Sequence, residues 1–192
     1  MASPKFSKTN VEQTIDLKEV FGVDFRGMTS LKEAIGGAII ERIRDRTAKG
    51  EGISFTGDTA RKVKLKSPYS KEYADSLEFK AFGKSRNSVN MKLTGDMLGL
   101  MDIKLQSGNQ ITIGWNDAEE NAKAYNHSVG DTVPRRPFFG VSKSELKEIA
   151  KEFESEINEA LKNNQSDQRK AFESQVANLI ASLTSGGQDG ES

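Results

Sequence analysis

The stretch "MDIKLQSGNQITIGW", Met101 to Trp115, alternates apolar and polar residues on both sides of a short loop that contains glycine. A period of two places the apolar side chains of a strand on one face. The apolar members are Met101, Ile103, Leu105, Ile111, Ile113 and Trp115. The loop Ser107–Asn109 has the composition of a hairpin connection. The stretch therefore predicts a β-hairpin with one apolar face, as in an antiparallel sheet covered on one side.

Three shorter segments upstream show the same period. They are "VKLK" with Val63 and Leu65, "DSLEFKAF" with Leu77, Phe79 and Ala81, and "VNMKL" with Val89, Met91 and Leu93. Between the last of them and the hairpin, "LTGDMLGLM" at residues 93–101 breaks the alternation and predicts a turn with one helical turn. Together these segments predict a small antiparallel meander.

Helical patterns flank the predicted sheet. On the N-terminal side, Ser30 and Glu33 form a capping-box pattern before an apolar stripe at helical spacing. Gly36-Gly37 inside this helix is unfavourable by about 1 kcal/mol per glycine relative to alanine, and a close contact between helix and sheet would explain it. On the C-terminal side, residues 116–130 predict a short helix capped by Asn116 or Asp117. A second capping box, Ser142 with Glu145, begins a long helix with an apolar stripe that reaches Leu161.

These elements predict an α+β fold in which an N-terminal helix and a long C-terminal helix pack on the sheet. We expect four parts: an extended N-terminal arm at residues 1–29, an α+β domain at 30–164, an extra helix at 165–184 and a disordered tail at 185–192. Only 35% of the residues are hydrophobic, which is little for a core of this length. We therefore expect some apolar surface to be covered by neighbouring subunits.

The composition argues against catalysis and against a membrane span. The chain has no cysteine and one histidine, His127, so nucleophilic and metal chemistry are poorly supplied, and we expect no enzyme activity, cofactor, metal or small-molecule substrate. No apolar run approaches the roughly 20 residues that cross a bilayer. We expect a soluble, cytoplasmic protein without a signal peptide. Basic and acidic residues balance at 28 each, so nothing global predicts a nucleic-acid partner.

A local basic stripe is the exception to this balance. It consists of Arg61, Lys62, Lys64 and Lys66. This stripe is a candidate for a DNA contact, and a solvated strand face explains it at least as well.

The segment "TVPRRPFFG" joins two predicted helices and is the candidate interface. Pro134 and Pro137 keep it stiff and extended, so that little entropy is lost when a partner binds. Arginine and phenylalanine are enriched in interface cores. Adjacent residues of an extended segment face opposite ways, so we expect one of Phe138 and Phe139 in the core, and the other, or the arginine pair, against a partner. The candidate interface set is His127, Pro134, Arg135, Arg136, Pro137, Phe138, Phe139 and Gly140.

At these residues the sequence resembles the phage virion morphogenesis family. In "AKAYNHSVGDTVPRRPFFGVS", residues 122–142, an alanine-rich helix is followed by a histidine, a glycine and a Pro-x-Arg-x-Phe-x-Gly series. On this chain the series falls on His127, Gly130, Pro134, Arg136, Phe138 or Phe139, and Gly140. Two further segments, "SPYSKEYADSLEFKAFGKS" at 67–85 and "VNMKLTGDMLGLM" at 89–101, resemble the middle of such proteins. The resemblance covers residues 30–162.

The resemblance implies a structural virion protein of a tailed bacteriophage, without catalytic activity. Such proteins act as tail completion, tail terminator or neck proteins that form rings where the tail joins the head. It implies a hexameric or dodecameric homo-oligomer, assembled in the host cytoplasm, with connector, neck and tail-tube proteins as partners. If DNA passes transiently through the ring, the basic stripe of Arg61, Lys62, Lys64 and Lys66 is the candidate that lines the channel. Two alternatives remain open: a DNA-contacting packaging or connector-associated protein, and a tail-tube component that forms long polymers.

Overall fold

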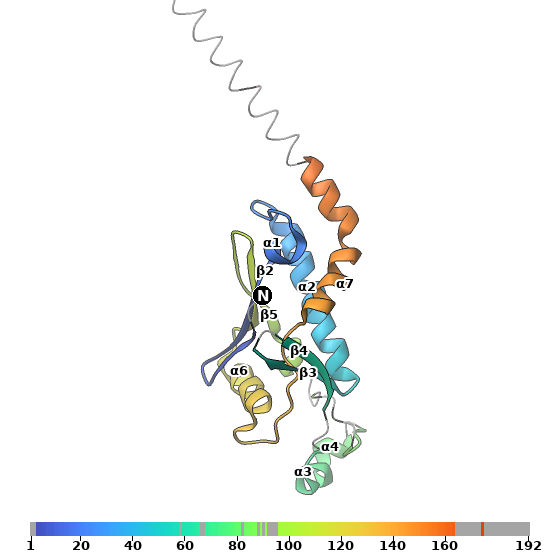
Figure 1. The fold of residues 1–192 in the computed structure, drawn as a ribbon. Helices are drawn as coiled ribbons and strands as arrows, with labels where there is room; N and C mark the ends of the chain where they lie inside the picture. The colour runs from blue at the N-terminus through green and yellow to red at the C-terminus, as the bar shows by residue number, and fades with distance from the viewer. Residues whose placement is uncertain are drawn as a thin grey trace, which may run out of the picture. The chain divides into compact units, whose positions relative to one another are not determined.

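The computed structural model describes residues 3–57, 59–65, 68–81, 83–87, 89, 91, 96–163 and 174. The chain divides into two compact units, Met1–Glu152 and Phe153–Ser192. The first unit has the expected α+β class, with a four-stranded antiparallel sheet, a separate two-stranded hairpin and helices (Figure 1). Among the described residues, no helix is both long enough and apolar enough to cross a membrane.

The sheet joins two strands near the N-terminus to a hairpin that is distant from them in the sequence. Its strands are β1 (Lys5–Ser7), β2 (Asn10–Asp16), β5 (Met101–Ser107) and β6 (Gln110–Trp115), in the order β1-β2-β6-β5. The separate hairpin consists of β3 (Glu51–Thr56) and β4 (Thr59–Lys64). The predicted meander is wrong, because β6 pairs with β2 as well as with its sequence neighbour β5.

The hairpin of β5 and β6 confirms the strongest sequence pattern, with one change of register. Ile103 pairs with Ile113, but a bulge follows, so that Leu105 lies opposite Thr112. A bulge adds one residue to a strand and thereby reverses the side on which later side chains lie. Leu105, expected in the core, is consequently 58% exposed.

The N-terminal segment is part of the sheet, so the expectation of an arm is wrong for residues 5–21. β2 pairs with β6 from Glu12 to Asp16, and the side chains of Val11 and Ile15 are fully buried. The helix α1 (Leu17–Phe21) follows directly, and the Leu17 amide donates to the carbonyl of Asn109 in the β5–β6 turn. Several apolar residues of the expected arm, namely Val11, Ile15, Leu17 and Phe25, therefore belong to the core.

The helix α2 (Thr29–Ala48) packs on the sheet through Gly36. A Cβ atom at this position would lie 2.4 Å from Cδ1 and 2.9 Å from Cγ1 of Ile103, whereas Gly37 has no atom within 4 Å of such a Cβ. The predicted close approach is confirmed, and Gly36 is the residue that allows it. The predicted capping box is wrong: the N-cap is Met28, two residues before Ser30, and it makes no side-chain cap hydrogen bond.

The segment around Phe79 is helical instead of extended. Two short helices, α3 (Lys71–Asp75) and α4 (Leu77–Ala81), replace the strand predicted from "DSLEFKAF". The hydroxyls of Ser70 and Ser76 accept hydrogen bonds from amides three residues later, as N-cap residues do. Leu77 is 86% exposed although Phe79 is buried. The apolar alternation of this segment therefore does not correspond to the buried face of a strand.

The remaining helices of the first unit agree better with expectation. The helical turn in 93–101 is α5 (Asp96–Gly99), and Asp117 caps α6 (Ala118–Tyr125), which continues into a π-helical turn, η1 (Asn126–Gly130). The capping box of Ser142 and Glu145 begins α7 (Lys143–Glu152) as predicted. The single long helix expected to reach Leu161 is divided, because α7 ends at Glu152 and a turn at Phe153 precedes the next helical residues.

In the second unit, residues 154–163 are helical. Most of the predicted "VNMKL" strand and the predicted helix at 165–184 lie outside the described residues.

Candidate functional site

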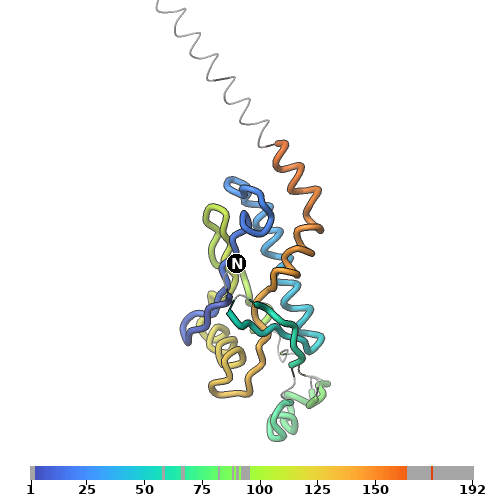
Figure 2. The backbone as a smooth tube through the Cα atoms, in the orientation of Figure 1, coloured from blue at the N-terminus to red at the C-terminus, as the bar shows by residue number. Residues whose placement is uncertain are grey.

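The segment from Thr132 to Ser142 returns from η1 to the start of α7 and is fixed by its backbone (Figure 2). The Arg46 guanidinium donates to the carbonyls of Phe138 and Gly140, at 2.8 and 2.7 Å. The Pro137 carbonyl accepts from the Ile53 amide at 2.7 Å, and the Val141 amide donates to Gln13 at 2.9 Å. Buried backbone groups need such partners, so this segment is held by β2, α2 and β3 together.

Both phenylalanines of the segment lie in the core. Phe138 is 0% and Phe139 1% exposed, and their ring centroids lie 6.1 and 5.0 Å from that of Trp115. The expectation that one of them faces a partner is wrong. Strict alternation fails here because the segment is covered on both sides by other elements of the same unit.

A buried ion pair closes the C-terminal end of the segment. Arg46 Nη1 lies 2.6 Å from Glu145 Oε1, and both side chains are almost fully buried. Burial acts to raise the pKa of the Glu145 carboxyl, but the Arg46 charge and the hydrogen bonds from Ser142 and Arg46 outweigh it, so the net shift of this pKa is downward. The charges are thus compensated within the fold.

Gly140 is the only residue of this segment with a backbone conformation that residues with an L side chain rarely adopt. Its φ is +115°, and a Cβ there would lie 2.6 Å from the Phe55 ring and 2.8 Å from Pro4. The glycine of the Pro-x-Arg-x-Phe-x-Gly series therefore has a local structural reason.

The candidate interface set is thus split by the fold. Arg136, Phe138, Phe139 and Gly140 are buried, and His127 and Pro137 are half-buried. Pro134 and Arg135 remain exposed, at the start of the segment. Only these two residues of the set are fully available to another chain.

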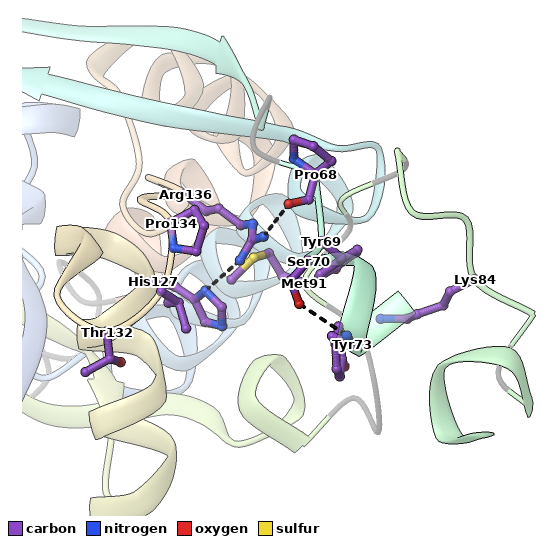
Figure 3. A pocket seen from close by; sticks show the side chains of 11 residues that line it. Pro68, Tyr69, Ser70, Tyr73, Lys84, Met91, His127, Thr132, Pro134 and Arg136 are labelled. Atoms are coloured by element: carbon purple, nitrogen blue, oxygen red, sulfur yellow. Dashed lines mark hydrogen bonds between the residues drawn. The ribbon is translucent and has the colours of Figure 1, made fainter. Parts of the chain in front are cut away.

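A cavity of about 540 Å³ lies beside this exposed start. The segment 127–136 forms one wall, and the 68–73 segment and Lys84 form the other (Figure 3). The polar and aromatic lining residues are Tyr69, Ser70, Tyr73, Lys84, His127 and Arg136, and apolar surface comes from Pro68, Met91, Val133 and Pro134. The described lining contains no carboxylate.

Two cations contact one aromatic ring in this cavity. The guanidinium of Arg136 lies 4.9 Å and the Lys84 ammonium 5.3 Å from the centroid of Tyr69. Such cation–π contacts partly replace the lost hydration of a cation. Burial lowers the pKa of Lys84 and that of Arg136 from their ordinary values. The described lining therefore carries two cationic side chains, and Arg136 is also held by the His127 ring and the Pro68 carbonyl.

His127 contacts Arg136 within the 127–136 wall, and Arg136 reaches the other wall through the Pro68 carbonyl, at 3.4 Å from Nη2, and the Tyr69 ring. The His127 carbonyl accepts from the Arg136 amide at 2.6 Å, and the His127 Nδ1 lies 3.4 Å from Arg136 Nη1. Because a guanidinium only donates, Nδ1 is the acceptor and the imidazole proton is on Nε2. Burial, together with the Arg136 charge, lowers the pKa of His127 to about 4. The ring is consequently neutral at pH 7.

Sequence reasoning missed the 68–84 wall of the cavity. Tyr69, Tyr73 and Phe79 form an aromatic cluster with centroids 5.2–5.5 Å apart. The signal was the tyrosine pair four residues apart in "PYSKEYAD", with Ser70 in an N-cap position. Because we predicted a strand at residues 77–81, we did not interpret this pattern as a helix.

The basic stripe does not form one surface. Arg61, Lys62 and Lys64 are exposed on β4, and Lys66 lies outside the described residues. Successive residues of a strand face opposite ways, so Lys62 and Lys64 share a side of the hairpin and Arg61 lies on the other.

Within the described ranges, no three His, Asp or Glu side chains gather closely enough to hold a metal ion. No family model, no curated protein and no solved structure matches the chain.

Proposed function

We propose that this chain is a structural virion protein of a tailed bacteriophage. In this proposal it forms an oligomeric ring at the head–tail junction, as a tail terminator, tail completion or neck protein, and acts without catalysis. The proposal starts from the resemblance over residues 30–162. The observed α+β class, with a small antiparallel sheet and packed helices, is compatible with the fold that the resemblance implies.

One observation carries the proposal furthest. The motif at residues 122–142 corresponds to one continuous structural unit: α6, η1, the buried segment and the capping box of α7. Its Arg136, Phe138 and Gly140 each have a separate structural role in that unit. An ordered series of residues that together specify a substructure is stronger support for a shared fold than any one of them alone.

The contact with neighbouring subunits is assigned to the exposed start of the segment. Pro134 and Arg135 lie there, next to Asp131, which pairs with Lys8 at 3.2 Å. Proline fixes φ and the ion pair links the loop to the β1–β2 turn, so this surface is ordered before a partner arrives. The buried phenylalanines pack on Trp115 inside the unit and take no part in this proposed contact.

The oligomeric state of the purified chain tests the proposal. Light scattering after gel filtration, with negative-stain imaging of the same fraction, should give a closed ring of several subunits. Arg135→Glu should convert the ring to folded monomers, whereas Lys151→Glu, a charge reversal at an exposed site on α7, should leave it intact. Rings that survive Arg135→Glu would remove the loop from the interface, and a monomer at every concentration would contradict self-assembly.

The two alternatives give different results in the same preparation. A tail-tube component would form long polymers in the images. A DNA-contacting protein would bind duplex DNA with an affinity that falls steeply with salt, and Lys62→Gln with Lys64→Gln would reduce the slope by about one per lost phosphate contact.

A further inference from the structure

We infer that the groove between α2 and the start of β5 binds the C-terminal segment 169–183 of a second copy of this chain. We use the name Gly37 groove for this site. The inference rests on the self-association in the proposed function and adds a contact that is separate from the loop at Arg135.

The Gly37 groove is a hollow of about 420 Å³ at the outer edge of the sheet, where β5 is the last strand. Its apolar lining includes Ile40 of α2 and Leu100, which directly precedes β5. Leu100 is 52% exposed, so the groove presents apolar surface to solvent. The Arg44 guanidinium donates to three backbone carbonyls within residues 98–101. These bonds fix the wall of the groove before a partner binds.

Gly37 is a residue of α2 that the packing of a single copy does not explain. Glycine is about 1 kcal/mol less favourable than alanine inside a helix, and Gly36 has a reason because Ile103 lies against it. At Gly37 a Cβ atom would have no other atom within 4 Å, although this residue lines the groove. A position without a side chain lets another backbone approach closely. The open space at Gly37 therefore fits a helix of another chain.

The segment 169–183 has the apolar pattern that such a groove accepts. Its large apolar residues recur at i, i+4, i+7, i+8 and i+11, which predicts a helix with one apolar stripe. They are Phe172, Val176, Leu179, Ile180 and Leu183. Isolated helices shorter than about 12–15 residues are marginal in water, and packing of the apolar face supplies most of their stability in proteins. Anchors at this spacing are typical of a helix that binds in a hydrophobic groove.

The net charges of the groove and the segment are opposite. The described lining of the groove carries two carboxylates, Glu41 and Asp102, and one guanidinium, Arg44, which pairs with Glu41. The segment 169–183 carries two basic residues, directly before the stripe, and one acidic residue. Opposite charges of this kind favour the correct pairing of two surfaces.

The course of α7 favours a second copy as the source of the segment. Arg42 and Arg46 of α2 pair with glutamates of α7. At 3.6 residues per turn they lie about 140° and 180° around α2 from Gly37. α7 and β5 accordingly lie on opposite sides of α2 (Figure 1). The chain after Glu152 thus starts on the side away from the groove, and the segment of a neighbouring copy reaches the groove without passing around α2.

Cross-linking of the full chain tests the contact, because the chain contains no cysteine of its own. Leu100→Cys and ¹⁵N-labelled Leu179→Cys are mixed and treated with a short bis-maleimide, and mass spectrometry separates heterodimers from homodimers. We expect the heterodimer with Leu179→Cys, or with Val176→Cys or Leu183→Cys, which sample the same stripe. Leu77→Cys, at an 86% exposed site on α4, replaces Leu100→Cys as the control and should give at least about tenfold less heterodimer.

A second variant tests whether the groove itself makes the contact. Gly37→Leu, added to the Leu100→Cys chain, should lower the yield of heterodimer at least about fivefold, because the new side chain occupies the groove. Lys147→Leu adds the same side chain at an exposed site on α7 and should leave the yield unchanged. Urea unfolding followed by fluorescence of Trp115, the only tryptophan, checks that both variants are folded. Equal yields from the two variants would overturn the inference.

The other possible occupants give different products. In the double variant Leu100→Cys with Leu179→Cys, an intramolecular cross-link would assign the groove to the segment of the same copy if the mixed single variants give no heterodimer. Homodimers of Leu100→Cys alone would indicate a contact between two grooves, and no cross-link in any mixture would leave the groove to a different protein. Each of these three results contradicts the inference.

The outcome is separable from that of the proposed ring. Closed rings of the wild-type chain without the heterodimer would overturn the groove contact alone. The heterodimer without closed rings would support the groove contact and contradict the ring.

Discussion

At the scale of single residues, Phe138 was predicted as a candidate interface residue, and the structure places it in the core. It is fully buried against Trp115 although it lies between a proline and a second phenylalanine. Phe138→Ala should lower the free energy of unfolding by about 3–5 kcal/mol, because it removes a ring and leaves a cavity. Urea unfolding followed by Trp115 fluorescence measures this loss.

The matched control for this substitution is Leu77→Ala, since Leu77 is 86% exposed. It should change stability by less than about 0.5 kcal/mol. Similar losses in both variants would mean that Phe138 does not have its buried position in solution. Because Phe138 holds the core, replacing it tests folding, and assembly is better tested at Arg135.

His127 and Glu145 give the chain a pH dependence with a definite sign. The pKa of His127 is about 4 in the folded chain and 6.5 ordinarily, so between these values the unfolded chain binds more protons. Stability should therefore fall by roughly 1 kcal/mol from pH 7.5 to 5.5, and further towards pH 4. The pKa of Glu145 is lowered below its ordinary 4.5, so its contribution is present above pH 4.5 and is lost as the pH falls below that value.

Urea unfolding at pH 7.5, 5.5, 4.5 and 3.5 measures the two contributions. His127→Gln should abolish most of the loss between pH 7.5 and 5.5 and keep the loss below 4.5. An unchanged profile in His127→Gln would show that the imidazole titrates normally in the folded chain.

At the scale of elements, the contact of α2 with the sheet depends on which of two glycines faces it. Gly37→Ala should raise the free energy of unfolding by about 0.5–1 kcal/mol, because alanine favours the helix and the site is open. Gly36→Ala gains the same propensity, but Ile103 must move away from the new methyl group. We expect Gly36→Ala to be less stable than Gly37→Ala by at least about 1 kcal/mol.

The two single variants serve as each other's control, because helix propensity is the same at both positions. Thermal and urea unfolding of the pair give the difference directly. Equal stability would show that the helix can rotate or lift from β5 without cost.

Elements specified by nearby residues could be predicted from the sequence. The β5–β6 hairpin, α6 with its Asp117 cap, and the capping box of Ser142 and Glu145 depend on spacings of a few residues. The strand prediction for residues 77–81 was wrong because Leu77 and Phe79 are two residues apart, as in a strand. The N-cap at Ser76, which indicates a helix, was not recognised. The bulge after Ile103 has no sequence signal in this stretch that we can name.

The candidate site was harder to predict than the elements, because it is assembled from distant segments. The motif at 127–140 indicated one wall, and nothing in its spacing indicates that Tyr69 stacks on Arg136. Only one of the two phenylalanines was expected in the core, because burial on both sides requires β2, α2 and β3 around the segment. That information is in the tertiary structure and not in local periodicity.

At the scale of the whole molecule, the N-terminal strands are the clearest difference from expectation. Deleting residues 1–16 should abolish cooperative unfolding, because it removes β1, β2 and the Gln13 contact to Val141. Circular dichroism and Trp115 fluorescence during urea unfolding test this. Lys5→Ala, an exposed side chain in β1, should behave as wild type. Cooperative unfolding of the deleted chain would restore the view of residues 1–16 as an arm.

The pairing of β2 with β6 has a consequence for synthesis of the chain. Thr14 and Thr112, which share a hydrogen bond across these strands, are 98 residues apart, and Gln13 and Val141 are 128 apart. During translation β2 leaves the ribosome long before β6 and the 136–142 segment that cover it. Its apolar side chains stay exposed over that interval, and contacts between distant residues form slowly. Completion of this sheet is thus timed by the arrival of residues 110–142.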